Sequence, residues 1–197
     1  MTTIIDYGAG NLRSVQNTLD ELGAKYVVTN RGDEVAKATK LVFPGVGHFG
    51  QMMTAIDRLE LRQPIAECVH AGTPLLGICL GLQCMFEESA EAPDKRGFGF
   101  FPGSIRRFEG AMRIPHMGWN SLDRIKDSKL LRGIDPQPFT YFAHSFYAPV
   151  VEATTATCTY SVPYTAVLER DNVFGVQFHP EKSGTIGLQI VKNFLDL

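Results

Sequence analysis

The sequence has few cysteines, a single tryptophan and no long apolar run. Its four cysteines, at positions 68, 79, 84 and 158, form no CxxC pair and show no metal-ligand spacing. This pattern argues against a disulfide framework or a zinc site, so no metal ion or other cofactor is expected. The most apolar window, residues 74–86, is shorter than the ~20 residues of a membrane-spanning helix and contains glycines and a glutamine, so no membrane insertion is expected.

An excess of one charge is also absent. Nineteen Lys and Arg residues against twenty-one Asp and Glu residues give a formal net charge of −2, far from the basic surplus typical of nucleic-acid-binding proteins. The first residues lack the features of a secretory signal, so a cytoplasmic location is expected. With 197 residues, 44% hydrophobic and 20% charged, the chain is expected to form one domain over residues 1–197.

Hydrophobic periodicity predicts an α/β fold. Short apolar or β-branched runs at residues 2–5, 26–29, 41–43 and 75–78 alternate with stretches whose apolar residues recur at helical spacing. The run at 75–78 is typical of a strand buried on both faces of a parallel sheet, which favours a doubly wound core. The second half has strand-like segments of antiparallel or mixed type, at 104–108, 139–147, 154–160, 165–169 and 173–178, and it closes with a helix around 186–194.

The segment Gly77-Ile78-Cys79-Leu80-Gly81 has the spacing of a nucleophile elbow. It lies between the apolar strand and a helix expected over residues 80–87. Glycines two residues before and after the cysteine remove Cβ atoms that would collide in a strained turn, and the N-terminus of the following helix favours a thiolate. A lone cysteine is more often an inert core residue, but this context favours a nucleophile.

A thiolate nucleophile needs a base, and His179 is the best placed of the five histidines. It follows the strand expected over residues 173–178 and precedes Pro180, which biases it toward extended geometry. Side chains at i and i+2 of an extended segment share a face, so Glu181 can orient the imidazole. Cys79, His179 and Glu181 would then supply the nucleophile, base and orienting acid of covalent acyl transfer. By itself, His-Pro-Glu more commonly marks a capped surface turn.

Acyl transfer also needs hydrogen-bond donors for an oxyanion. The N–H of Leu80 directly follows the nucleophile, and the loop at residues 44–47 follows a neighbouring predicted strand, where Val46 or Gly47 could present its N–H. A plain tight turn explains this loop equally well. Because its glycines make a peptide rotation easy, we expect the loop to rest without its donor turned inward and to rotate when a partner binds its own ligand.

Glycines after the first predicted strand invite a dinucleotide-binding interpretation. The segment starting at Gly8 fits G-x-G-x-x-G only to its second glycine, because Arg13 occupies the third position and opposes close helix–strand packing. A P-loop motif is also absent from the sequence. No nucleotide cofactor is therefore expected.

Together these residues resemble the class I glutamine amidotransferase family. The motifs at 6–11, 44–47, 116–120 and 179–183 are similar to one branch of it, the glutaminase subunits of imidazole glycerol phosphate synthases, and the similarity spans nearly the whole chain. The resemblance implies a flavodoxin-like sheet with helices on both faces and extra antiparallel strands in the second half. It also implies hydrolysis of glutamine to glutamate and ammonia through a γ-glutamyl thioester on Cys79, with ammonia delivered to a (β/α)₈ cyclase subunit in histidine biosynthesis.

The same resemblance implies where glutamine binds. Gln83 and Gly47 would contact it, and the backbone at Ser145 and Phe146 would close over its α-amino and carboxylate groups. Many related glutaminase domains have a glycine where Ser145 stands. Main-chain contacts are therefore expected at this position.

A partner interface is expected because the chain shows no acceptor site for ammonia. The resemblance implies that Trp119 and Lys182 contact the cyclase subunit; without it, Trp119 would be a core residue in a Gly-Trp-Asn turn and Lys182 a solvated charge. Two other functions stay open at this point. The triad could serve a cysteine peptidase or γ-glutamyl hydrolase of related fold, or the elbow could be vestigial in a non-catalytic scaffold subunit.

Overall fold

The computed structural model describes residues 1–8 and 11–197, so Ala9 and Gly10 of the motif at 6–11 lie outside the described residues. Its centre is an eight-stranded sheet in the order β2-β1-β3-β4-β13-β12-β11-β8. These strands are β1 (Thr2–Ile5), β2 (Tyr26–Thr29), β3 (Lys40–Gly45), β4 (Leu75–Cys79), β8 (Asp123–Arg124), β11 (Thr154–Thr159), β12 (Pro163–Arg170) and β13 (Val173–Val176).

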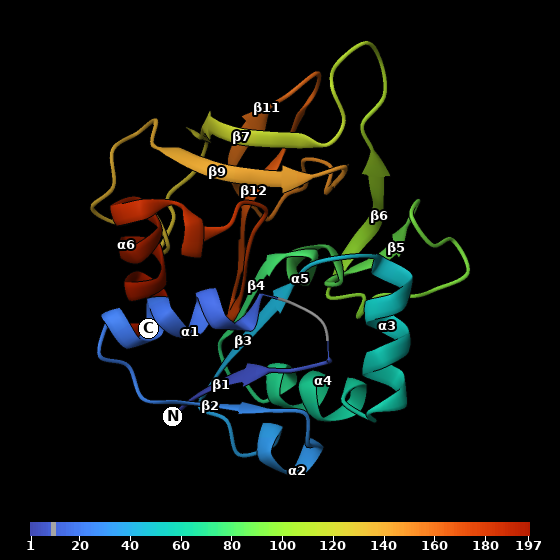
Figure 1. Ribbon diagram of the computed structural model, residues 1–197, viewed down its shortest axis with the longest axis vertical. Helices are drawn as coiled ribbons and strands as arrows, with labels where there is room; N and C mark the ends of the chain where they lie inside the picture. Colours follow the sequence, from blue (N-terminus) through green and yellow to red (C-terminus); the bar gives the residue numbers. More distant parts are fainter. Residues whose placement is uncertain (9–10) are drawn as a thin grey trace.

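Helices cover both faces of this sheet (Figure 1). On one face, α1 (Leu12–Glu21) and α6 (Gly184–Leu195) share a core cluster with the strands. The other face packs against the remaining helices, which are α2 (Gly32–Val35), α3 (Phe49–Arg58), α4 (Arg62–His70) and α5 (Leu80–Gln83). The predicted α/β fold with helices on both faces is confirmed.

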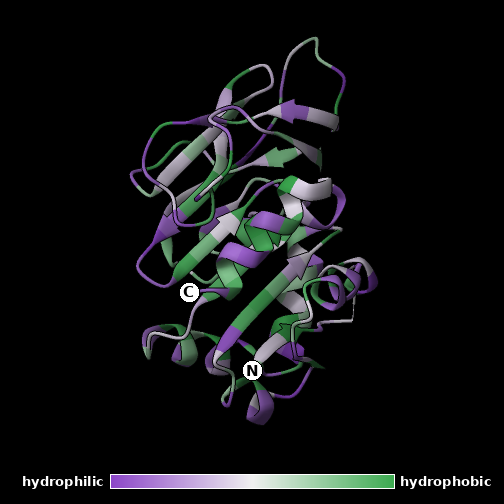
Figure 2. Ribbon diagram, turned by 90° about the vertical axis from the view of Figure 1, so that its left-hand side faces the viewer, coloured by the Kyte–Doolittle hydropathy of each residue, from purple (hydrophilic) through white to green (hydrophobic). Residues whose placement is uncertain are grey.

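The central strands are apolar because they serve two cores at once. In β3, Val42 belongs to one core cluster, whereas Leu41 and Phe43 belong to the other, and in β4 Leu76 and Leu75 are divided in the same way. Figure 2 shows the hydrophobic colour of the strands at the centre of the molecule. Parallel pairing joins β1, β2, β3, β4 and β13, and antiparallel pairing adds β12, β11 and β8.

Two smaller sheets lie beside the central one. The first has the order β10-β6-β5, made of β10 (Phe146–Tyr147), β6 (Phe101–Arg107) and β5 (Phe86–Ser89), and the second pairs β7 (His116–Ser121) with β9 (Phe139–His144). The sheet of β7 and β9 lies at one end of the molecule (Figure 1), above the segment that leads into α6. Extra antiparallel strands were expected in this half of the chain, and they are present.

Several sequence-based boundaries were wrong. The helix expected over residues 80–87 ends at Gln83, because β5 begins at Phe86 and pairs with Phe101 of β6. The strand expected over 139–147 is divided at Ser145, whose two sides pair in different sheets. The expected Gly-Trp-Asn turn is part of β7, where Trp119 pairs with Tyr141.

Among residues 1–8 and 11–197, no helix is long and apolar enough to span a bilayer.

Candidate functional site

Cys79 ends β4 in a strained conformation, with φ of 54° and ψ of −108°. This region is sparsely populated for residues other than glycine, so the surrounding packing must hold the turn in place. A Cβ on Gly81 would lie 1.9 Å from the carbonyl oxygen of Phe43, and a Cβ on Gly77 would lie 2.7 Å from the backbone of Gly81. The glycines thus remove Cβ atoms that would collide at the turn, as the sequence pattern predicted, and they also permit the close approach of β3 to α5.

His179 reaches this turn because β13 runs parallel to β4 and beside it. Val176 pairs with Ile78, so the residues that follow β13 emerge next to Cys79. The Nδ1 atom of His179 lies 2.8 Å from Oε1 of Glu181, and the two side chains are only 5% and 3% exposed. The expected pair is present, but Pro180–Lys182 forms a 3₁₀ turn, η1, where an extended segment was expected.

The environment of His179 favours its charged form. Burial disfavours the imidazolium and by itself would lower its pKa, but hydrogen bonds with Cys79 and Glu181, together with the negative charges of these groups, raise the pKa of His179 to about 10. Because Nδ1 faces Glu181, the second ring nitrogen, Nε2, is the one available to the sulfur. This geometry suits a thiolate–imidazolium pair.

A pocket of about 260 Å³ opens over the sulfur. It is smaller than the ~300 Å³ at which pockets for drug-sized ligands begin, which suits a ligand of amino-acid size. The oxyanion and glutamine-binding residues that the sequence suggested all lie in its wall. The described lining residues are Val46, Gly47, Cys79, Leu80, Gln83, Glu91, Pro115, Ala143, His144, Ser145, Phe146 and His179.

Tyr7 holds the loop at 44–47, a role that the glycine pattern of the motif at 6–11 does not indicate. The N–H of Val46 donates to the Tyr7 hydroxyl over 3.1 Å, and this hydroxyl donates to the carbonyl of Val46, also over 3.1 Å. Tyr7 is buried, and burial raises its pKa to about 12, so the hydroxyl stays protonated. In this conformation the N–H of Val46 is bound to Tyr7, which is not among the residues that line the pocket.

A second missed residue is Gln177, which lies between β13 and His179. Its Nε2 atom is 3.6 Å from the sulfur of Cys79. Its Oε1 atom accepts a hydrogen bond from Nε2 of Gln83 over 3.1 Å, and Gln83 also donates to the carbonyl of Phe146 over 2.8 Å. A chain of hydrogen bonds through Gln177 therefore connects the pocket wall at Gln83 and Phe146 with the nucleophile. The register between β13 and β4 places Gln177 beside Cys79 and the start of α5, and local sequence patterns do not indicate this register.

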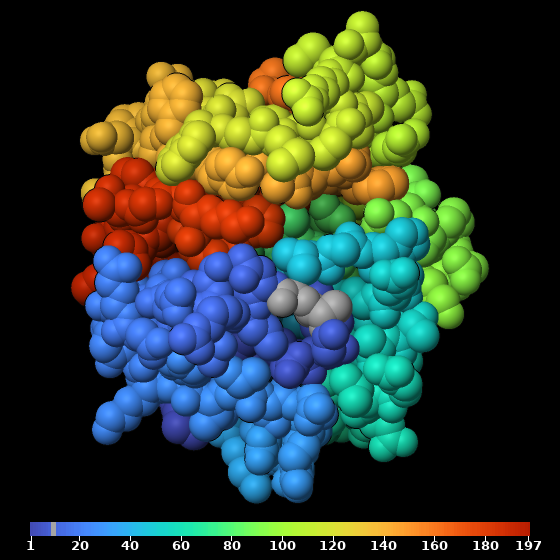
Figure 3. Space-filling model, viewed as in Figure 1, coloured from blue at the N-terminus to red at the C-terminus, as the bar shows by residue number. Residues whose placement is uncertain are grey.

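Trp119 and Lys182 converge on Tyr141 at the surface. The Trp119 side chain is 56% exposed, which excludes the alternative that it is a core residue. Its ring meets that of Tyr141 edge to face at 6.2 Å, and Nζ of Lys182 lies 5.8 Å from the centre of the same ring. Met117 and Phe139 of the same two-stranded sheet are also exposed. In Figure 3 the segments of β7 and β9, yellow-green and orange, lie at the surface.

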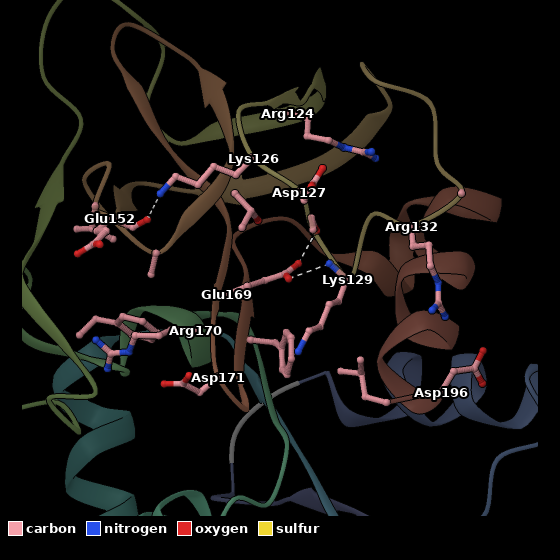
Figure 4. Close-up of a pocket in the computed structure, with 18 of the residues that line it drawn as sticks. Arg124, Lys126, Asp127, Lys129, Arg132, Glu152, Glu169, Arg170, Asp171 and Asp196 are labelled. Atoms are coloured by element: carbon pink, nitrogen blue, oxygen red, sulfur yellow. Dashed lines mark hydrogen bonds between the residues drawn. The ribbon is translucent and has the colours of Figure 1, made fainter.

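A larger hollow, of about 1170 Å³, is shown in Figure 4, and Cys79 is not among the described residues that line it. Its wall carries charges of both signs, and no cysteine or histidine occurs among the described residues that line it. The carboxylate of Glu169 accepts hydrogen bonds there from the Ser128 hydroxyl and from the N–H groups of Lys129 and Leu130. Glu169 thus fixes the loop that follows β8. The volume of a cavity alone therefore does not identify the reactive site.

Comparison with known proteins identifies relatives of this chain. The chain matches the family described as glutamine amidotransferase class-I over residues 3–197. A protein from Deinococcus radiodurans named imidazole glycerol phosphate synthase subunit HisH is 44% identical over 195 residues, which cover 97% of this chain and 91% of that protein. A protein of the same name from Chlorobium luteolum is 44% identical over 200 residues and is covered completely, as is this chain. The solved structure titled PurLQS from Thermotoga maritima has a TM-score of 0.78 at 18% identity, with 99% of this chain and 97% of that chain covered, which is a likeness of fold.

Proposed function

The chain belongs to the class I glutamine amidotransferase family, and on this premise we propose that it hydrolyses glutamine to glutamate and ammonia at Cys79. The observation that carries the proposal is that Cys79 and His179 meet in the wall of a pocket of amino-acid size, with Glu181 bound to His179 behind it. Family membership favours glutamine over the peptide and polyglutamate substrates that the triad alone would allow. It also disfavours a vestigial elbow.

The proposed reaction has two steps. The thiolate of Cys79 attacks the side-chain carbonyl carbon of glutamine, and the imidazolium of His179 gives its proton to the departing nitrogen, so that the C–S bond forms, the C–N bond breaks and ammonia leaves. Neutral His179 then takes a proton from water, whose oxygen attacks the thioester. The C–S bond breaks, glutamate is released, and the thiolate–imidazolium pair is restored. Glu181 holds the ring in the required orientation throughout.

The oxyanion of each tetrahedral intermediate needs two donors. The N–H of Leu80 has no partner within α5, because it belongs to the first turn of that helix. We assign the second donor to the loop at 44–47, through Val46 or Gly47. Since the N–H of Val46 is bound to Tyr7, the loop must turn before that group can serve, which supports a resting state of low activity.

The proposed partner is the (β/α)₈ cyclase subunit of an imidazole glycerol phosphate synthase, which would use the ammonia in histidine biosynthesis. The Deinococcus and Chlorobium relatives are named as subunits of that synthase. The exposed Met117, Trp119 and Phe139 on the sheet of β7 and β9 supply an apolar surface of the kind that anchors protein interfaces, and Lys182 adds a nearby cation. Gln83, Ser145 and Phe146 are proposed to hold glutamine.

The test uses the complex with the cyclase subunit and two nitrogen sources. Cys79→Ala should abolish product formation from glutamine and leave product formation from added ammonium intact. Cys68→Ala, which removes a buried thiol outside the pocket, serves as the matched control and should retain both activities. Loss of both activities in Cys79→Ala would assign the cysteine to structure. If the unmodified protein released no ammonia from glutamine in the complex but cleaved peptides or polyglutamate, the proposal would be wrong.

A further inference from the structure

Gln177 is the one buried side-chain amide that reaches the reactive sulfur among the described residues. It follows β13 directly, is 0% exposed, and donates from Nε2 to Sγ of Cys79 over 3.6 Å. Val176 pairs with Ile78, so Gln177 stands next to Cys79 across the sheet. Gln177 and His179 are two residues apart and approach the same sulfur from one segment.

The hydrogen-bond network fixes which end of the Gln177 amide faces the sulfur. The carbonyl of Phe146 can only accept, so Gln83 must present its NH₂ group to it, over 2.8 Å. The second hydrogen of that group then goes to Oε1 of Gln177, over 3.1 Å. This leaves the NH₂ group of Gln177 facing Cys79. The orientation of each amide is thus determined by its neighbour, starting from a backbone group whose role is certain.

The anchor of this network is itself held in place. Nδ1 of His144 lies 2.8 Å from the carbonyl of Phe146, and since the carbonyl accepts, Nδ1 carries the proton. Burial lowers the pKa of His144 to about 3, so the ring is neutral and its Nε2 accepts a hydrogen bond from the Tyr164 hydroxyl. The pocket wall at Phe146 is therefore fixed from two sides, by His144 and by Gln83.

We propose that Gln177 is a further catalytic residue, whose side-chain N–H stabilises negative charge on the Cys79 sulfur. The inference rests on the proposed function and assigns a role within the same site. The contact stabilises the resting thiolate, and it does so again when the C–S bond of the thioester breaks and the electron pair returns to sulfur. Hydrogen bonds to charged acceptors are stronger than those between neutral groups, so the effect on thiolate chemistry exceeds the effect on folding.

The test measures the rate of Cys79 alkylation by iodoacetamide against pH, with the modified peptide identified by mass spectrometry. Gln177→Met fills the same space without a donor. Gln177→Glu keeps the shape and the oxygen that accepts from Gln83 but replaces the donor by a carboxyl group. In Gln177→Met we expect the midpoint of the alkylation profile to move up by about one pH unit. In Gln177→Glu the upward shift should be larger, because a like charge is added.

The rate at high pH separates loss of a hydrogen bond from general damage. A more basic thiolate is more nucleophilic, so the plateau rate should rise about threefold in Gln177→Met while the midpoint moves up. Damage that loosens the site would also speed alkylation of the neighbouring buried Cys84, which is measured in the same digest and should stay unreactive if only the hydrogen bond is lost. Asn172→Leu is the matched control: Asn172 precedes the same strand and donates to the carbonyls of Val69 and Thr73, each over 2.8 Å, and its loss should leave both midpoint and plateau unchanged.

Folded Gln177 variants with an unchanged midpoint would overturn the proposal, as would a lower midpoint. If the variants do not fold, the unmodified protein provides the test: the ¹⁵N signal of the Gln177 side-chain amide should titrate with the alkylation midpoint and should not do so in Cys79→Ser. A signal insensitive to Cys79 refutes the contact. These outcomes concern the thiol alone and are separate from ammonia release, so glutamine hydrolysis can fail its test while the hydrogen bond from Gln177 to the sulfur is upheld, or the reverse.

Discussion

Replacing Tyr7 by phenylalanine should increase the glutaminase activity of the chain without its partner. The substitution removes the hydroxyl that accepts from the N–H of Val46 and donates to its carbonyl, both over 3.1 Å. The ring stays in place because it packs edge to face against Phe43, with ring centres 6.2 Å apart. A hydrogen bond contributes about 1 kcal/mol net, and Val46 is half-buried, so water recovers part of the loss. The resting loop should therefore be destabilised by about 1–2 kcal/mol relative to the rotated one.

A change of this size shifts the ratio of the two loop conformations by roughly 5- to 30-fold. The rate of ammonia release by the isolated Tyr7→Phe protein should rise by that factor, while the rate in the fully stimulated complex should change little. Tyr26→Phe is the matched control, since it removes a hydroxyl that donates to Asp20 over 3.0 Å outside the site. A folded Tyr7→Phe protein with unchanged or lower basal activity would refute the idea that the hydrogen bonds between Tyr7 and Val46 hold the loop in its resting conformation.

Three other substitutions test separate parts of the site. Glu181→Gln should lower glutamine turnover roughly 100-fold and lower the His179 pKa. Because the pKa of His179 is raised to about 10 in the folded chain, the stabilisation of the fold by protonated His179 is fully present below about pH 6.5 and is lost as pH rises through 10. The free energies of unfolding in urea of the unmodified and Glu181→Gln proteins should therefore converge over this pH interval. A constant difference would contradict the ion pair. Gly81→Ala places a Cβ 1.9 Å from a carbonyl oxygen and should cost about 3 kcal/mol in urea unfolding; a neutral result would contradict the tight elbow. Trp119→Ala should weaken partner binding by roughly 30-fold in titration calorimetry with little change in melting temperature, whereas equal affinity would remove Trp119 from the interface.

The sequence was most informative where local rules decide the structure. The elbow at Cys79 follows from two glycines at fixed spacing, and the strands around it follow from apolar runs. Helix α4 was not anticipated because Pro64 and charged residues interrupt its apolar pattern. The single domain over residues 1–197 and the roles of individual site residues stay predictions.

Contacts made across the sheet could not be predicted. The approach of Gln177 to Cys79 depends on which strand lies beside β4 and on the register between the two strands. Local hydrophobic periodicity determines neither of these. The contact of Tyr7 with Val46 likewise joins residues 39 positions apart. His179 and Glu181 were paired by an argument from extended geometry, yet the 3₁₀ turn of η1 brings them together. The predicted pair of His179 and Glu181 is present nevertheless, because both an extended segment and a 3₁₀ turn place the two side chains within hydrogen-bonding distance.

The tight packing at the end of β3 limits how far the loop at 44–47 can move. A Cβ on Gly45 would lie 2.4 Å from the backbone nitrogen of Gly81, so β3 packs closely against α5 as far as Gly45. Rearrangement is then confined to the peptide planes beyond Gly45, and such a small rotation changes very little apolar area in contact with water. Heat-capacity change on unfolding or binding follows apolar exposure. The factor by which the partner stimulates glutamine hydrolysis at Cys79 should therefore vary little with temperature. Conformational changes that close a whole domain bury more apolar area and depend more strongly on temperature.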